Sequence, residues 1–344
     1  MHKNTLVITG GLGFIGAHFV HYVFDRMLDT KIIVLDKNTY AADKCRMDKF
    51  LTHDRFLYVE GDIADTEFIT AFFAKHRPTQ LINFAAESHV DNAIAGPHIF
   101  LQTNVNGTFN LLEAARTTWF ERPHQLKPEF EQALFYQVST DEVFGSLSAS
   151  GRFSETSNYA PNSPYSASKA AADHWVRCYH KTYGLPILIS HCSNNYGPYQ
   201  HEEKLIPTII RTALSGQPIP LYGTGENIRD WLYVVDHCQA IYTLLTKAKR
   251  GERYTIGGNN EQSNVSICEA IIRILDVKAP KPNAQSYAEQ IRFVSDRPGH
   301  DYRYAIDARK IKNDLGWQPE EEFERGLEKT VIHYLEKYKQ LIDN

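Results

Sequence analysis

A glycine-rich turn between an apolar run and a helical pattern constrains the fold of this chain more than any other feature. Leu6-Val7-Ile8-Thr9 is typical of a buried strand and leads directly into Gly10-Gly11-Leu12-Gly13-Phe14-Ile15-Gly16, where a helical pattern begins. Glycines at this spacing allow a tight turn and bring the backbone close to a pyrophosphate at the positive N-terminus of a helix. The pattern therefore predicts a dinucleotide-binding strand, turn and helix.

An acidic residue at the end of the second apolar run supports this interpretation. Asp36 lies about 20 residues beyond Gly16, the distance at which a carboxylate binds the 2′-hydroxyl of the adenosine ribose. The same carboxylate would repel a 2′-phosphate, although the neighbouring Lys37 would attract one. The sequence predicts NAD as the cofactor. NADP, or a glycine-rich turn that binds no nucleotide, are the alternatives.

The first 190 residues alternate short apolar runs with longer helical patterns. Most runs lack polar alternation, as expected for strands buried on both faces of a parallel sheet. We predict an α/β fold, with a Rossmann-type doubly wound parallel sheet over residues 1–190 to which the chain returns around 231–260. Frequent prolines and glycines after residue 190 indicate a smaller C-terminal substrate-binding lobe over 191–344. The predicted strands lie at 6–9, 32–35, 56–59, 81–84, 134–139 and 187–190, and the predicted helices at 13–28, 65–76, 98–119, 163–183 and 322–341.

Composition argues against several other classes of protein. The 344 residues carry a formal net charge of −4, which argues against binding to nucleic acid driven by charge. The five cysteines lie far apart, without the spacing of a disulfide framework or a zinc site, so we expect reduced thiols, no metal and a cytoplasmic location. No apolar run approaches the roughly 18–20 residues that span a bilayer, so no membrane association is expected.

Two polar clusters are candidates for acid and base chemistry. Thr140-Asp141-Glu142 follows the run at 134–139, and open α/β sheets bind ligands at the carboxyl ends of their strands. Tyr165 and Lys169 stand four residues apart at the start of the helix predicted over 163–183, and therefore share one face. A tyrosine acts as a base near neutral pH only if its pKa of about 10 falls by about three units, which an ammonium and a positive nicotinamide ring favour. Taken singly, each cluster is explained equally well by a solvated turn or a surface tyrosine.

Several motifs together resemble one enzyme family over about residues 5–335. The glycine turn with Tyr165 and Lys169 is similar to the extended short-chain dehydrogenases/reductases. More narrowly, the chain resembles the dTDP-glucose 4,6-dehydratases. The Thr-Asp-Glu triplet is the most discriminating part, because sugar-nucleotide epimerases of this group usually lack that acid pair. The resemblance rests on Phe84–Asp91, Ser139–Gly145, Cys192–Tyr199, Glu203–Pro207, Ile228–Val234 and Asp296–Asp301.

The resemblance implies a lyase of deoxysugar biosynthesis that uses NAD without consuming it and dehydrates a sugar nucleotide, dTDP-glucose. Tyr165, assisted by Lys169, would take the proton of the C4 hydroxyl as hydride passes to NAD, and Thr140 would hydrogen-bond the C4 oxygen. Glu142 would then remove the C5 proton as general base, and Asp141 would protonate the departing C6 hydroxyl as general acid. Hydride would return to C6 and a proton to C5, giving a 4-keto-6-deoxy sugar. Adjacent carboxyls suit such opposite roles, because each pushes the other's pKa away from its own.

The resemblance also implies which residues bind the two small molecules. Lys204, Arg229 and Arg297 suit a diphosphate, for which guanidinium groups offer paired donors. The expected cofactor contacts are Gly10, Gly13, Phe14, Ile15, Gly16, Asp36, Lys37, Asn38, Asp62, Ile63, Phe84, Ala85, Ala86, Thr103, Ser139, Tyr165, Lys169 and Asn195. The expected substrate contacts are Glu87, Ser88, Thr140, Asn194, Lys204, Leu205, Pro220, Tyr222, Arg229, Asn264, Arg297 and His300.

The chain departs from the family pattern at four positions. Asn92 and Ala93 stand where the family has arginine and serine, Phe144 where it usually has tyrosine, and Tyr302 where it commonly has arginine. None belongs to the acid and base set, but the nucleotide base stays open among dTDP, UDP, CDP and GDP. The family also implies a homodimer formed through the helices at 98–119 and 163–183.

Two other functions remain open at this point. A sugar-nucleotide 4-epimerase would share the fold, Tyr165 and Lys169, but would have no need of Asp141 and Glu142. A non-catalytic NAD-sensing protein would have no reason to keep both pairs together with Thr140. The sequence therefore favours the dehydratase.

Overall fold

The computed structural model describes residues 4–282 and 284–342, so the expected domain ends at residues 1 and 344 lie outside the described part. Within it, a seven-stranded sheet has the order β12-β8-β7-β4-β1-β2-β3, and every neighbouring pair is parallel. The predicted α/β fold with a doubly wound parallel sheet is confirmed. The strands are β1 (Asn4–Thr9), β2 (Thr30–Asp36), β3 (Phe56–Glu60), β4 (Gln80–Asn83), β7 (Leu134–Thr140), β8 (Ile187–Cys192) and β12 (Arg253–Ile256).

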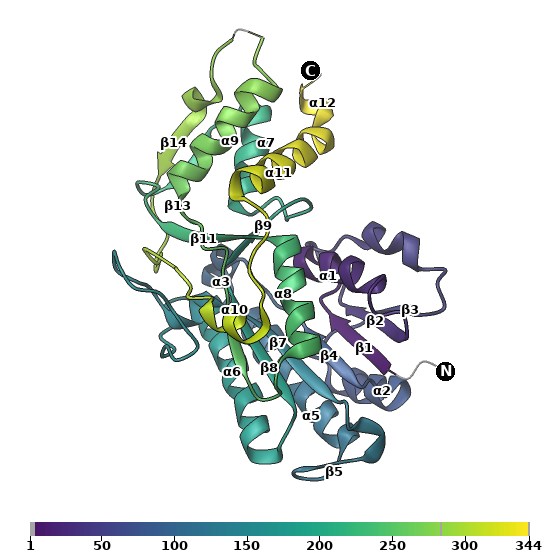
Figure 1. The fold of residues 1–344 in the computed structure, drawn as a ribbon. Helices are drawn as coiled ribbons and strands as arrows, with labels where there is room; N and C mark the ends of the chain where they lie inside the picture. Colours follow the sequence, from purple (N-terminus) through teal and green to yellow (C-terminus); the bar gives the residue numbers. More distant parts are fainter. Residues whose placement is uncertain (1–3, 283, 343–344) are drawn as a thin grey trace.

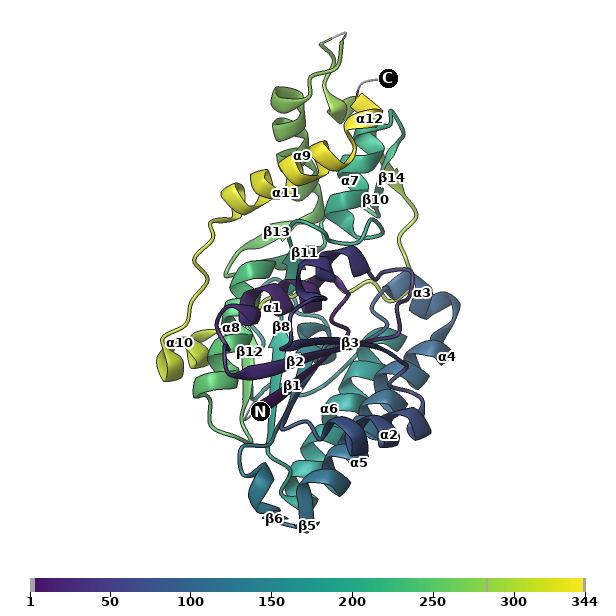
Figure 2. The same cartoon turned by 90° about the vertical axis from the view of Figure 1, so that its right-hand side faces the viewer.

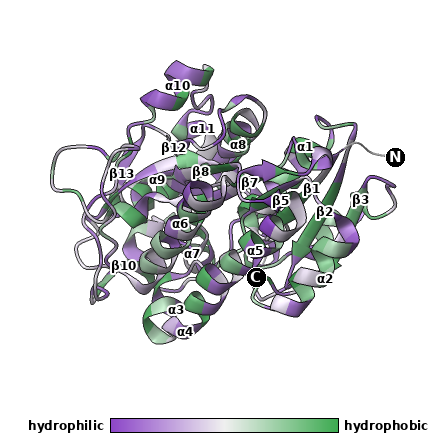
Figure 3. Ribbon diagram, turned by 90° about the horizontal axis from the view of Figure 1, so that it is seen from below, coloured by the Kyte–Doolittle hydropathy of each residue, from purple (hydrophilic) through white to green (hydrophobic). Residues whose placement is uncertain are grey.

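Helices cover both faces of this sheet (Figure 1 and Figure 2). Leu6 and Ile8 of β1 pack on one face, and Val7 between them packs on the other, as successive strand residues must. The first face carries α1 (Phe14–Phe24), α8 (Val234–Lys247) and α10 (Arg309–Leu315), and the second carries α2 (Thr66–His76), α5 (Thr108–Trp119) and α6 (Pro164–Tyr183). Figure 3 shows these helices in both hydrophobic and hydrophilic colours, as expected for helices with one buried side.

A smaller lobe with its own apolar core lies above the carboxyl ends of the strands in Figure 1. Its helices are α7 (Leu205–Leu214), α9 (Asn264–Lys278), α11 (Phe323–Lys337) and α12 (Lys339–Ile342). Short strands join it to the larger part: β9 (Asn194–Tyr196), β11 (Ile228–Tyr233) and β13 (Glu261–Ser263) form one sheet, and β10 (Ile219–Tyr222) pairs with β14 (Ile291–Val294).

Helix α6 begins and ends where local chemistry predicts. Ser163 caps its first turn, with its side chain accepting a hydrogen bond from the Ser166 backbone N–H. Pro164 stands at the first position, where its missing N–H costs nothing. Gly184 ends the helix in the left-handed region at φ 77°, which disfavours other residues. The helix therefore carries Tyr165 and Lys169 in its first turns, as expected.

The predicted helix over 98–119 is helical throughout, but it is not one α-helix. The chain forms α4 (Pro97–Phe100), a π-helical segment (Leu101–Gly107) and then α5. The predicted helix over 322–341 is α11 followed by the short α12. The sequence also gave no prediction for α3 (Val90–Ala95), for the hairpin of β5 (Phe120–Arg122) and β6 (Gln125–Leu126), or for the 3-10 helices Lys44–Phe50, Pro128–Phe130, Asp141–Phe144 and Tyr287–Gln290.

The described residues contain no helix that is both long enough and apolar enough to cross a bilayer.

Candidate active site

The strand order reverses between β1 and β4, and a doubly wound sheet binds ligands at such a point. Two cavities of about 290 Å³ and about 120 Å³ lie there. They share the lining residues Gly10, Gly13, Ala41, Phe84 and Ala86, so they form two parts of one cleft. The turns after β1 and β4 supply these shared residues, apart from Ala41.

The glycine turn has the shape that a dinucleotide requires. Helix α1 begins at Phe14 behind Gly13, and no side chain caps its first turn. A Cβ atom on Gly16 would lie 2.2 Å from the carbonyl oxygen of Gly10, and one on Gly10 would lie 2.7 Å from the backbone nitrogen of Ala85. Residues with a Cβ atom therefore do not fit at Gly10 and Gly16. Because no side chain caps the first turn of α1, its backbone N–H groups are available to a pyrophosphate. The predicted residues fit NAD.

The acidic residue predicted to bind the adenosine ribose, Asp36, lies where the sequence suggested. Asp36 ends β2, and its carboxylate accepts hydrogen bonds from the backbone N–H of Leu12 at 2.9 Å and of Asn38 at 2.8 Å. Lys37, which would attract a 2′-phosphate, is paired instead with Asp62, with 2.5 Å between its Nζ and the carboxylate. This pairing favours NAD over NADP.

The Thr-Asp-Glu triplet lines the larger cavity at the end of β7. The Thr140 side chain accepts a hydrogen bond from the backbone N–H of Glu142 at 3.2 Å and donates one to Asp141 Oδ1 at 3.3 Å. Asp141 is 1% exposed, and its Oδ2 has no hydrogen-bond partner among the described residues. The turn thus holds two carboxyl groups beside the cavity, one of them with a free oxygen.

The electrostatic surroundings of these two carboxyl groups affect their pKa values differently. Burial raises the pKa of Asp141 well above its usual value, and the charges of Glu142 and Asp230 raise that pKa further. Burial also raises the pKa of Glu142, but Arg229, Arg297 and Lys204 oppose the increase. Asp141 is therefore suited to donate a proton and Glu142 to accept one.

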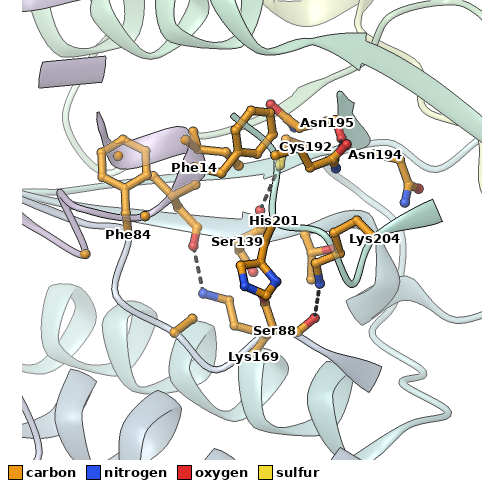
Figure 4. Close-up of a pocket in the computed structure, with 18 of the residues that line it drawn as sticks. Phe14, Phe84, Ser88, Ser139, Lys169, Cys192, Asn194, Asn195, His201 and Lys204 are labelled. Atoms are coloured by element: carbon orange, nitrogen blue, oxygen red, sulfur yellow. Dashed lines mark hydrogen bonds between the residues drawn. The ribbon is translucent and has the colours of Figure 1, made fainter. Parts of the chain in front are cut away.

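Tyr165 and Lys169 line the same cavity, and Figure 4 shows Lys169 reaching into it beside Ser139. Lys169 Nζ donates a hydrogen bond to the backbone oxygen of Val138 at 2.8 Å. Burial and the charge of Glu142 raise the pKa of Tyr165 well above 10, the direction opposite to the one that a base needs. The phenol therefore becomes a base near neutral pH only when positive charge in the cleft outweighs both effects.

Most of the expected cofactor contacts lie together. The expected contacts near the Thr-Asp-Glu turn and the start of α1 line the larger cavity, and those near Asp36 line the smaller one. Asn38 is the exception, since it lines neither cavity and donates its backbone N–H to Asp36. The larger cavity is lined by Gly10, Gly13, Phe14, Ile15, Gly16, Phe84, Ala86, Ser139, Tyr165, Lys169 and Asn195, and the smaller by Gly10, Gly13, Asp36, Lys37, Asp62, Ile63, Phe84, Ala85, Ala86 and Thr103.

The expected substrate contacts divide into two groups. Ser88, Asn194 and Lys204 line the larger cavity together with Thr140, and Lys204 Nζ donates a hydrogen bond to the backbone oxygen of Ser88 at 3.0 Å. Glu87 lines the smaller cavity instead. The remaining residues lie outside the lining of both cavities: Leu205, Pro220, Tyr222, Arg229, Asn264, Arg297 and His300.

Arg229 differs from the expectation that its donors face a diphosphate. It is 5% exposed, and its guanidinium donates to the backbone oxygens of Ile228, Asp301 and Tyr302 at 2.8, 3.0 and 3.3 Å. Its charge still lowers the pKa of Glu142. In this structure Arg229 therefore acts on the carboxyl group of Glu142 through its charge.

Asp91 connects two other substrate candidates. Its carboxylate accepts a hydrogen bond from the Tyr222 hydroxyl at 3.1 Å and lies 3.5 Å from Arg297 Nη1. The rings of Tyr222 and His300 are 6.3 Å apart. Tyr222, Arg297 and His300 therefore form a cluster on the smaller lobe that faces α3 of the larger part.

The four departures occupy different environments. Asn92 donates to the Tyr40 hydroxyl at 3.3 Å, and Ala93 is fully buried against Phe100 and Tyr165. Phe144 packs on the His191 ring at 4.8 Å, whereas Tyr302 is 46% exposed.

Sequence reasoning missed several residues that line the cleft. His201 and Gln200 lie between two motifs that it did use, and their position in that segment was the available signal. Within the described residues, no group of His, Cys, Asp and Glu side chains could hold a metal ion. The other missed lining residues are Leu35, Thr39, Ala41, Ala42, Gly61, Val138, Cys192, Ser193 and Glu203.

Comparison with known proteins agrees with this geometry. A model of the GDP-mannose 4,6-dehydratase family matches residues 7–330. The dTDP-glucose 4,6-dehydratase of Xanthomonas campestris pv. campestris (strain B100) is 50% identical over 331 residues, which cover 96% of this chain and 93% of that protein.

Solved structures agree as well. The dTDP-glucose 4,6-dehydratase of Bacillus anthracis in complex with NAD superposes with a TM-score of 0.84 and 42% identity, covering 98% of both chains. That of Streptomyces venezuelae, also solved with NAD bound, gives a TM-score of 0.87 and 40% identity, again covering 98% of both chains. The chain belongs to the family of the dTDP-glucose 4,6-dehydratases.

Proposed function

We propose that this chain catalyses the NAD-dependent dehydration of dTDP-glucose to dTDP-4-keto-6-deoxyglucose, a step of deoxysugar biosynthesis. The observation that carries the proposal is the pair of carboxyl groups, Asp141 and Glu142, beside Tyr165 and Lys169 in one cavity. An epimerase has no use for a protonated acid next to an ionised base. A dehydratase needs both, because it removes a proton and a hydroxide from neighbouring carbons.

The described side chains suit the steps of this reaction. NAD, when bound, supplies the chemistry of accepting hydride from C4 and returning it to C6. Tyr165 takes the proton of the C4 hydroxyl, supported by the charge of Lys169, and Thr140 hydrogen-bonds the C4 oxygen. The C4 ketone acidifies the C5 proton, which Glu142 removes. Asp141 protonates the departing C6 hydroxyl, so one water leaves, and a proton returns to C5 as hydride returns to C6.

The binding assignments are part of the same proposal. The turns after β1, β2 and β4 hold NAD, with Asp36 on the adenosine ribose. Ser88, Asn194 and Lys204 bind the sugar and diphosphate within the larger cavity, and the cluster of Tyr222, Arg297 and His300 contacts the rest of the nucleotide. The relatives named above act on dTDP-glucose by name, which supports thymine as the base.

We further propose that the protein is a cytoplasmic homodimer. Phe109 of α5 and Trp175 of α6 are 36% and 40% exposed, and their rings meet edge to face at 5.2 Å. Large aromatic residues gathered on an exposed helix pair are typical of a subunit interface. A second copy of this chain would cover them.

A product panel tests the proposed activity. The protein is incubated with dTDP-, UDP-, CDP- and GDP-glucose, and each product is analysed by mass spectrometry. We expect loss of one water, fastest with dTDP-glucose. A product of unchanged mass with inverted configuration at C4 would contradict the dehydratase, and faster water loss from another nucleotide would contradict only the assignment of the base.

A further inference from the structure

A buried carboxylate that the proposed reaction does not use lies directly behind the active site. Asp173 is 1% exposed and stands on α6, four residues after Lys169. Its Oδ2 accepts hydrogen bonds from Ser139 Oγ at 2.6 Å and from the Tyr159 hydroxyl at 3.2 Å, and it lies 3.2 Å from His191 Nε2. The Tyr159 hydroxyl also lies 2.8 Å from His191 Nε2. Three separate segments of the chain therefore converge on this one oxygen atom.

The charge of Asp173 acts on Lys169. Lys169 is 4% exposed, and the one hydrogen bond that its ammonium makes in the described structure goes to the Val138 carbonyl. Burial of an ammonium favours its neutral form, and an anion nearby opposes this effect. Burial lowers the pKa of Lys169, and Asp173 is the first group that raises it. The i and i+4 positions on α6 keep the two charges on the same helix face.

The hydrogen bond from Ser139 acts on the catalytic turn. Ser139 lies in β7 between Val138, which accepts the Lys169 hydrogen bond, and Thr140, which begins the Thr-Asp-Glu turn. A short hydrogen bond between Ser139 and Asp173 therefore fixes the end of β7 against α6. The Thr-Asp-Glu turn follows β7, whereas Tyr165 and Lys169 lie on α6. Asp173 lies on α6 and contacts β7 through Ser139.

We propose that Asp173 is a positioning residue for the reaction: it is the buried counter-charge of Lys169 and, through Ser139, it fixes the catalytic turn against α6. This inference rests on the proposed function, because it requires that Tyr165 and Lys169 carry out C4 oxidation. It predicts that removing the charge alone impairs the oxidation step, even when shape and hydrogen bonding are preserved.

Other ionisable groups near the pair do not replace Asp173. Cys192 of β8 faces Lys169, but burial raises the pKa of its thiol to about 12, so it is uncharged near neutral pH. The groups that face Asp173 are His191 of β8 and Tyr159 of the loop before α6. Behind Tyr159 stand His174 of α6 and Arg253 of β12.

The test is Asp173→Asn, measured as the pH dependence of C4 oxidation in the NAD-loaded protein. Oxidation is followed by the absorbance of reduced NAD in a single turnover with dTDP-glucose. Without the anion, Lys169 loses its proton at lower pH, the phenol of Tyr165 becomes harder to ionise, and the acid limb of the rate moves to higher pH. We expect a shift of about one pH unit, which is a tenfold change in ionised fraction at a given pH, and a KM within about threefold of the native value.

Tyr159→Phe is the matched control. It removes one hydrogen bond to the same oxygen but leaves the carboxylate charged, so its acid limb should coincide with that of the native chain. An Asp173→Asn limb that also coincides with the native limb would overturn the proposed role of Asp173. A Tyr159→Phe limb that moves as far as that of Asp173→Asn would overturn it too, because general disturbance of the network would then explain both.

Two further measurements keep the result decisive. If Asp173→Asn does not fold, Ser139→Ala carries the test: it should slow deuterium exchange at C5 more than C4 oxidation, and equal slowing of both, or none, would contradict the role of Ser139. The native chain is run in parallel throughout. If the native chain releases no water from dTDP-glucose, the proposed function fails, whereas native dehydration with an unaltered Asp173→Asn profile contradicts only this inference.

Discussion

At the scale of single residues, Asp141 and Glu142 have unequal surroundings, which suit the opposite roles proposed for them. Asp141 is almost fully buried with a second carboxyl group beside it, and both effects favour its protonated form. Glu142 is exposed enough to border the cavity, and three cations favour its ionised form. Exchanging either carboxyl for its amide should therefore block one step and spare the other.

For Glu142→Gln, we expect the exchange of solvent deuterium into C5 to fall by about 10²–10⁴-fold, the usual contribution of a general base. C4 oxidation depends on Tyr165 and Lys169, so reduced NAD should still form. Nuclear magnetic resonance of the recovered sugar nucleotide measures the first, and absorbance measures the second.

Asp141→Asn is the matched control for that experiment. It leaves the base intact, so C5 exchange should continue while loss of water slows. If Glu142→Gln exchanged C5 deuterium at the native rate, the base would be another residue.

The residues that could be predicted are those whose role depends on neighbours in the sequence. The glycine turn, Asp36, the Thr-Asp-Glu triplet and the pair of Tyr165 and Lys169 each carry their geometry within a few positions. Arg229 could not be predicted in this way, because its donors bind carbonyl groups more than 70 positions later in the chain. The burial that raises the pKa of Tyr165 could not be predicted from sequence either, because distant elements provide it.

At the scale of elements, close contact of the first helix with the first turn is the strictest requirement. The Cβ position of Gly16 lies 2.2 Å from the Gly10 carbonyl oxygen, and backbone atoms cannot move aside as a flexible side chain can. Any side chain there must push α1 away from β1, and with it the N–H groups that we propose bind the pyrophosphate.

We therefore expect Gly16→Ala to destabilise the fold by about 1–3 kcal/mol, the usual cost of overpacking, and to lose bound NAD. Thermal unfolding and the NAD content of the purified protein measure the two effects. Gly96→Ala is the control, because the nearest atom to its added Cβ, the Asn92 carbonyl oxygen, is 3.8 Å away. Equal NAD content in both variants would show that this close approach is not needed for binding.

Strand positions followed from sequence because the apolar runs are continuous, and helix positions failed where tertiary contacts override the local pattern. All six predicted strands lie in the main sheet, because their apolar runs face helices on both sides. The π-helical segment at Leu101–Gly107 has no signal of its own, since its residues fit an α-helix equally well. At its end, Gly107 approaches Ile63 so closely that a Cβ would lie 2.5 Å from it. That contact depends on a residue in the turn between β3 and α2.

At the scale of the whole molecule, two lobes border the cleft, and Phe109 and Trp175 form an exposed aromatic face on α5 and α6. The division into a nucleotide-binding part and a substrate-binding part stays a prediction. The placement of β12 in the main sheet and of α9 and α11 in the smaller lobe is consistent with it. The aromatic face lies on α5 and α6, on the side of α6 away from the sheet, and Leu101, 52% exposed, precedes it in the π-helical segment.

The proposed dimer predicts that a charge on this face separates the subunits. In Trp175→Glu, a twofold interface would bury two carboxylates, because each substitution enters the contact twice, and an unpaired buried charge costs several kcal/mol. Light scattering after size-exclusion chromatography should then report the mass of one chain. Val277→Glu is the control: Val277 is 79% exposed on α9, outside this face, and its variant should keep the native mass. If the Trp175→Glu protein kept the native mass of a dimer, the subunit contact would lie elsewhere. If the native chain were already monomeric, there would be no dimer. In both cases α5 and α6 would face solvent in solution.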